Sequence, residues 1–158
     1  MTSSHEIEDR RLRRKTAAFR LKHDVGKVLR WSAPDKREAD ATALRARLAA
    51  DLLPETSGGG AKKDVLKSFF EWKREDGPMF DSSDPDLQTV EKAMAEVRLL
   101  LPSLLPLEEI SLSSLQSLDD ACAEASRACT AFYRRVAVEE GPEVLRPFGG
   151  RGRRGDGS

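Results

Sequence analysis

Residues 115–136 read LQSLDDACAEASRACTAFYRRV, the clearest helical pattern in the chain. Its apolar residues recur at alternating spacings of three and four, which places them on one face of an α-helix. The residues of this face are Leu115, Leu118, Cys122, Ala125, Cys129, Phe132 and Val136. The stretch therefore predicts one long helix with a continuous buried face, ending near Gly141 and Pro142.

A second face of the same kind precedes it. Its residues are Leu87, Val90, Met94, Val97 and Leu101. Pro85 suits the first position of this helix, and Ser83 or Asp84 suits the capping position before it. Because the two faces are close in sequence, they predict an antiparallel hairpin of helices at the C-terminal end of the fold.

Three further helices are expected N-terminal to this hairpin. They are predicted over residues 6–32, 35–53 and 62–76, and each is followed by a proline that cannot continue it. No run of alternating β-branched residues indicates a strand. The sequence thus predicts an all-α fold, a helical bundle of about five helices in one domain over residues 1–140, and a flexible Gly- and Arg-rich tail over residues 141–158.

Charge and composition limit the classes of partner. Lys and Arg total 27, Asp and Glu also total 27, and 39% of the residues are apolar, which is typical of a helical globular protein. A neutral chain is not expected to have nucleic acid as its main partner. Residues 6–31, however, carry nine basic and four acidic residues, so the first helix is predicted to be basic.

Two further features concern the cellular compartment. Cys122 and Cys129 lie two helical turns apart, roughly 10 Å along the axis, so they are too far apart to form a disulfide and are expected to be buried thiols. The longest apolar run, residues 99–107, is interrupted by Pro102 and Pro106. These features predict a cytoplasmic protein without a membrane segment.

The segment LKHDVGKVL, residues 21–29, has the clearest chemical character in the chain. Within it, residues 23–27 read His-Asp-Val-Gly-Lys, which resembles the phosphoacceptor box of sensor histidine kinases and related phosphotransfer proteins. In a helix His23 falls roughly opposite Val25, so we expect His23 to be exposed, with Phe19, Gly26 and Lys27 on adjoining turns of the exposed side.

The resemblance implies a role for each residue of this box. His23 is implied to attack phosphorus, Asp24 to orient or deprotonate it, and Lys27 to lie near the phosphoryl oxygens. Because the chain has no ATP-binding domain with glycine-rich lid motifs, the resemblance implies a phosphotransfer module that is not itself an enzyme. It implies no cofactor and no metal, and its protein partner would resemble a receiver domain.

The same residues also resemble the core motif of the HD superfamily of metal-dependent phosphohydrolases. There His23 and Asp24 would bind a divalent metal, and Lys27 would approach a substrate phosphate. Such a site needs another histidine from a different helix, and the chain has only His5 besides His23. The remaining interpretation is a solvated His–Asp pair on the surface of a basic helix.

A basic interaction surface on the first helix is the alternative function. Its predicted partner-binding residues are Arg13, Arg14, Phe19, Arg20, Gly26 and Arg30. Such a scaffold or adaptor would bind an acidic protein or nucleic acid. The sequence thus predicts a non-catalytic signalling or protein-interaction module, which we also expect to form a homodimer, because helix hairpins often complete four-helix cores across a two-fold axis.

Overall fold

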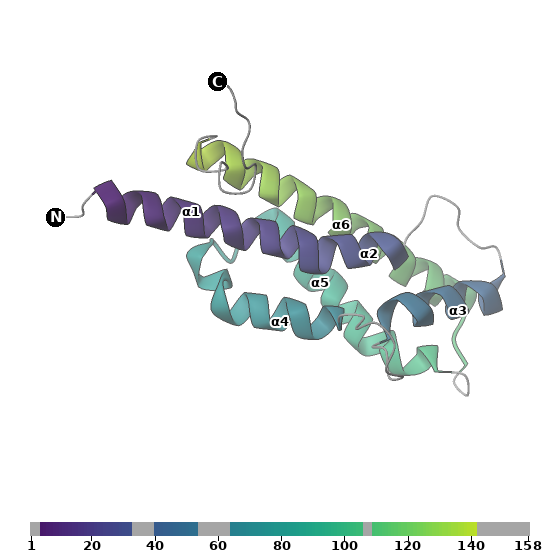
Figure 1. Ribbon diagram of the computed structural model, residues 1–158. Coiled ribbons are helices and arrows are strands. Elements are labelled where there is room, and N and C mark those ends of the chain that lie inside the picture. The colour runs from purple at the N-terminus through teal and green to yellow at the C-terminus, as the bar shows by residue number, and fades with distance from the viewer. Residues whose placement is uncertain (1–3, 33–39, 54–63, 106–108, 142–158) are drawn as a thin grey trace, which may run out of the picture.

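The computed structural model describes residues 4–32, 40–53, 64–105 and 109–141, and in the helices it leaves aside the side chains of residues 4–7 and 30–32 (Figure 1). The helices are α1 (Ser4–Leu21), α2 (Lys27–Ser32), α3 (Ala41–Leu52), α4 (Val65–Glu75), α5 (Pro85–Leu100) and α6 (Leu112–Glu140). A π-helical turn, Lys22–Gly26, joins α1 to α2, so that residues 4–32 form one continuous rod. With the rod taken as one helix, the prediction of an all-α bundle of five helices is confirmed.

Short-range hydrogen bonds fix where the helices begin. The Asp84 carboxylate accepts hydrogen bonds from the backbone N–H groups of Asp86 and Leu87, so Asp84 rather than Ser83 caps α5. The second predicted helix begins at Ala41 rather than at residue 35, with Asp40 as its cap. Residues 33–39 and the predicted tail from residue 142 onward lie outside the described residues.

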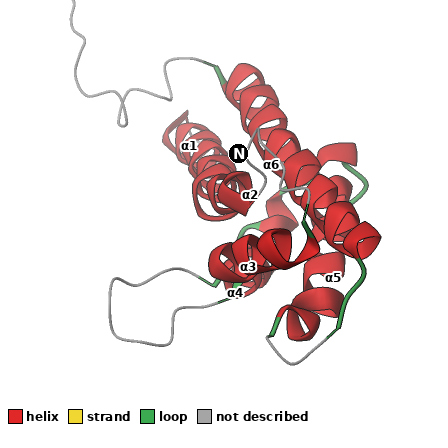
Figure 2. Ribbon diagram, turned by 90° about the vertical axis from the view of Figure 1, so that its right-hand side faces the viewer, coloured by secondary structure: helices red, strands yellow, loops and turns green. Residues whose placement is uncertain are grey.

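The hairpin of α5 and α6 is antiparallel, as predicted. Near one end the Ser117 hydroxyl donates to Glu96 at 2.9 Å, and near the other Arg135 donates to the carboxylates of Asp84 and Asp86 at 2.8 and 2.7 Å. In the turned view of Figure 2, α5 lies beside α6, and helices and loops make up all of the described chain. Every residue of the apolar face predicted within residues 115–136 is buried. The spacing of apolar residues therefore identified this interface correctly.

The rod runs antiparallel along α6. Arg14 near its start binds Glu140 at the end of α6, with 2.6 Å between Nε and Oε2. Further along, the Ser126 hydroxyl donates to the carbonyl oxygen of Gly26 at 2.8 Å. The rod also contacts α4, because the indole N–H of Trp72 donates to the carbonyl oxygen of Ala17 at 2.8 Å. These contacts hold residues 14–26 on two neighbouring helices.

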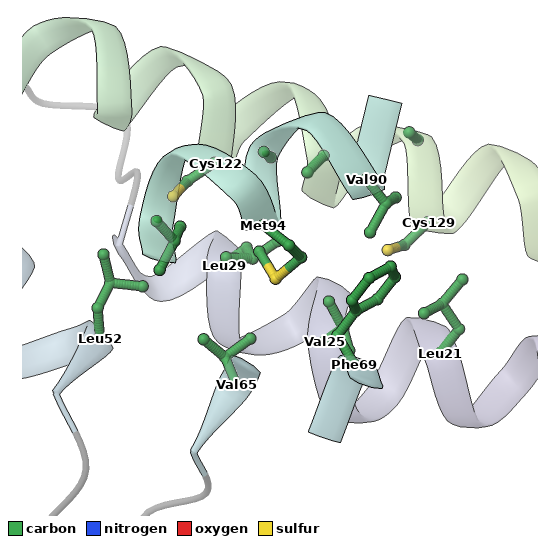
Figure 3. Packing of buried hydrophobic residues seen from close by; sticks show 14 of the residues in the cluster. Leu21, Val25, Leu29, Leu52, Val65, Phe69, Val90, Met94, Cys122 and Cys129 are labelled. Atoms are coloured by element: carbon green, nitrogen blue, oxygen red, sulfur yellow. The ribbon is translucent and has the colours of Figure 1, made fainter. Parts of the chain in front are cut away.

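One hydrophobic core joins all five helices. Figure 3 shows side chains from the rod, α3, α4, α5 and α6 converging, among them Leu21, Leu52, Phe69, Met94 and Cys122. Both cysteines are free thiols buried in this core, as the sequence predicted. Among the described residues, no helix is long and apolar enough to span a bilayer.

A buried ion pair connects α3 to the first half of α6. Arg47 Nη2 lies 3.2 Å from Asp119 Oδ2, and the side chain of Asp119 is only 3% exposed. Arg47 also lies 4.0 Å from Asp51 of its own helix, so a small polar cluster stands beside the apolar core. The contact between Arg47 and Asp119 joins α3 to α6.

Candidate functional site

The candidate site lies on the π-helical turn of the rod. The backbone N–H of Lys27 donates to the carbonyl oxygen of Lys22, five residues earlier, instead of to the usual partner four residues earlier. This turn spans Lys22–Gly26 and so contains most of the segment chosen from the sequence. Single π turns within α-helices occur frequently at functional sites. The prediction of one continuous helical segment is confirmed, whereas the wider turn within it was not predicted.

His23 is exposed and Val25 is buried. The side chain of His23 is 55% exposed, and Val25 has no exposed surface. The opposite placement of these two residues was the central prediction for this segment, and it is confirmed.

A carboxylate holds one nitrogen of the His23 ring. Nδ1 of His23 lies 3.0 Å from Oδ1 of Asp24, which is hydrogen-bonding distance. When Nδ1 carries the proton, it donates to Asp24, and Nε2 then presents its lone pair to solvent. The structure thus brings together two of the three predicted phosphoacceptor residues in a chemically useful arrangement.

Aromatic rings support the same imidazole from the side. The Phe19 ring stacks on the His23 ring with 5.9 Å between centroids and 24° between planes. Phe19 in turn lies edge-on to Tyr133 of α6, also at 5.9 Å. Tyr133 was not predicted from the sequence, because its position beside the buried Phe132 carries no chemical signal of its own. Packing between α1 and α6 therefore restricts the orientation of the His23 ring.

Two lysines give this surface positive charge. Lys27 is exposed at the start of α2, about one turn beyond His23. Lys22 extends over the Tyr133 ring, with 5.2 Å between Nζ and the ring centroid. Lys22 precedes the His23–Asp24 pair and Lys27 follows it by about one turn, so this part of the rod carries positive charge that favours an approaching anionic group.

The prediction that Gly26 lies on the exposed side is wrong. Gly26 is buried against α6, and a Cβ atom added to it would lie only 2.8 Å from Cβ of Cys129. The lack of a side chain therefore lets the rod approach α6 closely, and Gly26 is not available to a partner.

Burial raises the pKa of the Cys129 thiol to about 12, so this cysteine stays protonated and unreactive.

Replacing Gly26 with alanine is expected to destabilise the protein by about 1–3 kcal/mol, because the new methyl group overpacks the contact with Cys129. Gly77→Ala is the matched control, since a Cβ there has its nearest neighbour at 3.6 Å and the residue has no positive φ. That variant should stay within about 0.5 kcal/mol of the parent. Urea denaturation measures both, and equal stability of the two variants would contradict the close approach.

The predicted arginine surface is largely occupied by contacts within the chain. Arg14 binds Glu140 and donates to the carbonyl oxygen of Met79 at 2.6 Å. Arg20 pairs with Asp76 at 2.9 Å across to the end of α4. Arg13 is exposed, and the side chain of Arg30 lies outside the described residues. Arg14 and Arg20 thus fix the rod in the bundle, which leaves a smaller basic surface than the sequence indicated.

Within the described residues, no group of three or more His, Cys, Asp or Glu side chains is placed to hold a metal ion. The adjacent His23–Asp24 pair supplies two of the ligands that the HD-type motif would need. The other histidine, His5, lies in α1, and its side chain is outside the described part of the chain. The described geometry therefore offers no third ligand for a metal at His23.

Comparisons of this chain with protein families, curated proteins and solved structures found no match. An exposed imidazole with one nitrogen bound to a carboxylate presents the other nitrogen as a base, a nucleophile or a hydrogen-bond partner.

Proposed function

We propose that this protein is a non-catalytic, histidine-bearing interaction module in phosphoryl signalling, in which His23 accepts a phosphoryl group from a partner protein. The hydrogen bond between Nδ1 of the exposed His23 and the Asp24 carboxylate is the observation that carries this proposal. A phosphoryl acceptor needs a nitrogen that a large donor can reach and a carboxylate that orients the other nitrogen. The exposure of His23 favours the first, and Asp24 supplies the second.

The transfer step involves one bond formed and one bond broken. The Nε2 lone pair of His23 attacks phosphorus of an acyl phosphate on the partner, and a nitrogen–phosphorus bond forms. The bond between phosphorus and the acyl oxygen breaks, and its electron pair leaves with the partner's carboxylate. The ring keeps its proton on Nδ1 and becomes cationic, and the Asp24 carboxylate stabilises that charge.

The surroundings of His23 suit a protein donor of this kind. A phosphorylated carboxylate site is anionic, and Lys22 and Lys27 supply positive charge in this part of the rod. Phe19 restricts ring rotation through its stacking contact, so less conformational freedom is lost when the donor docks. The partner is therefore proposed to be a receiver-like protein with an acidic phosphorylation site.

The basic-scaffold alternative has less support. Arg14 and Arg20, which would have formed its contact surface, already bind Glu140 and Asp76. A partner that used them would first have to break these ion pairs. Arg13 is an exposed cation on α1, which is a small surface for binding nucleic acid.

The proposal is tested by treating the full chain with phosphoramidate, a small phosphoryl donor that releases ammonia on transfer. We expect an acid-labile phosphate on His23, detected as phosphoramidate-type nitrogen–phosphorus signal by ³¹P NMR and located by tandem mass spectrometry. The chain has two histidines, so His5→Gln is the matched control and should label like the parent. Label on His5 alone, or label on neither histidine, would refute the proposal.

A further inference from the structure

A cavity separate from the His23 surface lies where α4, the turn over residues 77–82 and the start of α5 meet. Its volume is about 270 Å³, and most of its lining is apolar. Phe69, Trp72, Phe80 and Leu87 form the apolar walls. Neither the phosphoacceptor proposal nor the core packing assigns a role to this space.

The aromatic walls of the cavity are held in fixed orientations. The Trp72 ring is anchored by its hydrogen bond to Ala17, and the Phe80 ring stacks on it at 5.8 Å with 14° between planes. Phe132 lies edge-on to Phe80 at 4.9 Å, and the Arg14 guanidinium lies 4.7 Å from the Phe80 centroid on a cation–π contact. The cavity therefore has aromatic walls that are fixed before any ligand arrives, although Trp72 is only 4% exposed and presents little of its ring.

The mouth of the cavity carries one positive and one negative charge. Lys73 of α4 and Glu91 of α5 form an ion pair, and each side chain is 47% exposed. An exposed ion pair contributes little to stability, so the two side chains can separate and admit a ligand. Because their charges cancel, the mouth does not favour a strongly charged molecule.

We propose that this cavity binds a small, uncharged, planar aromatic molecule of one or two fused rings. Edge-to-face contacts with Phe80 and with the small exposed part of Trp72 favour a flat ring over an aliphatic molecule of similar size. The volume lies just below the usual range of roughly 300–1,000 Å³ for small-molecule sites, which excludes larger ligands such as nucleotides. Lys73 or Glu91 can bind one polar substituent of the ring at the mouth.

Indole is a suitable probe, with cyclohexanol as an aliphatic comparison. Titrated into the full ¹⁵N-labelled chain, indole should produce saturable NMR shifts at the Trp72 indole N–H and the Gly77 amide. Cyclohexanol should bind about threefold to tenfold more weakly, because it cannot make aromatic contacts with the cavity walls. Equal affinities would overturn the aromatic specificity, and indole shifts confined to other parts of the chain would overturn the site.

A matched pair of substitutions tests the location independently of the shifts. Ser82 lines the cavity, and its neighbour Ser83 does not, although both are exposed in the same turn. Ser82→Phe should fill the cavity and weaken indole binding by about tenfold or more, whereas Ser83→Phe should bind like the parent. Ser83→Phe removes one exposed hydrogen bond, from the Ser83 hydroxyl to Asp81, which is expected to change stability only slightly. Unchanged affinity in the Ser82 variant would refute the proposal.

Discussion

Replacing His23 with glutamine is expected to abolish phosphoryl acceptance. Glutamine keeps a polar, flexible side chain at this exposed position, but its amide has no nucleophilic lone pair comparable to Nε2. The substitution should leave the thermal unfolding midpoint nearly unchanged, because more than half of the His23 side chain is exposed to solvent. Phosphoramidate labelling followed by ³¹P NMR measures the effect.

Asp24→Asn is the graded comparison in the same experiment. It keeps the shape of the side chain but removes the charge that holds Nδ1 and stabilises the cationic ring. We expect the labelling rate to fall roughly tenfold to hundredfold, which is less than for a buried carboxylate because solvent screens this pair. If the Gln variant labels at the parental rate, the acceptor is not His23. If the Asn variant labels at the parental rate and the Gln variant does not label, Asp24 has no orienting role.

The features that the sequence predicted well depend on local periodicity. The face of α6 from Leu115 to Val136 was identified because spacings of three and four are independent of the rest of the chain. The exposure of His23 followed in the same way from its position opposite Val25. Both results required only that the segment be helical.

The features that it missed depend on distant parts of the chain. The prediction assumed a rotation of about 100° per residue, as in an α-helix. The rotation per residue is smaller in the wider π turn, so Gly26 lies closer to the buried face that contains Val25. No local pattern signals that turn. Arg14 binds Met79 and Glu140, which lie 65 and 126 residues further along the chain. The local sequence pattern therefore predicted that Arg14 lies on a binding surface, although Arg14 connects the rod to α6 and to the turn after α4.

Phe132→Ala is expected to be the most destabilising of the substitutions discussed, at about 3–5 kcal/mol. The Phe132 side chain is 1% exposed and lies edge-on to Trp72 and Phe80, at 6.2 and 4.9 Å between centroids. Truncation removes both aromatic contacts and leaves a space that fixed neighbours cannot fill, since Trp72 is anchored to Ala17. A domain is typically stable by only about 5–15 kcal/mol, so much of the stability would be lost.

Phe70→Ala provides the matched control, because the same atoms are removed from a side chain that is 36% exposed on α4. Its cost should be about 1–2 kcal/mol, because truncation also removes the edge-on contact with Phe69 at 5.3 Å and the contact with Arg98 at 5.9 Å. Urea denaturation of both variants gives the comparison. If both variants lose a similar free energy of unfolding, the aromatic contacts of Phe132 do not stabilise the junction of α4 and α6. The cavity walls that Phe132 contacts would then not be rigid.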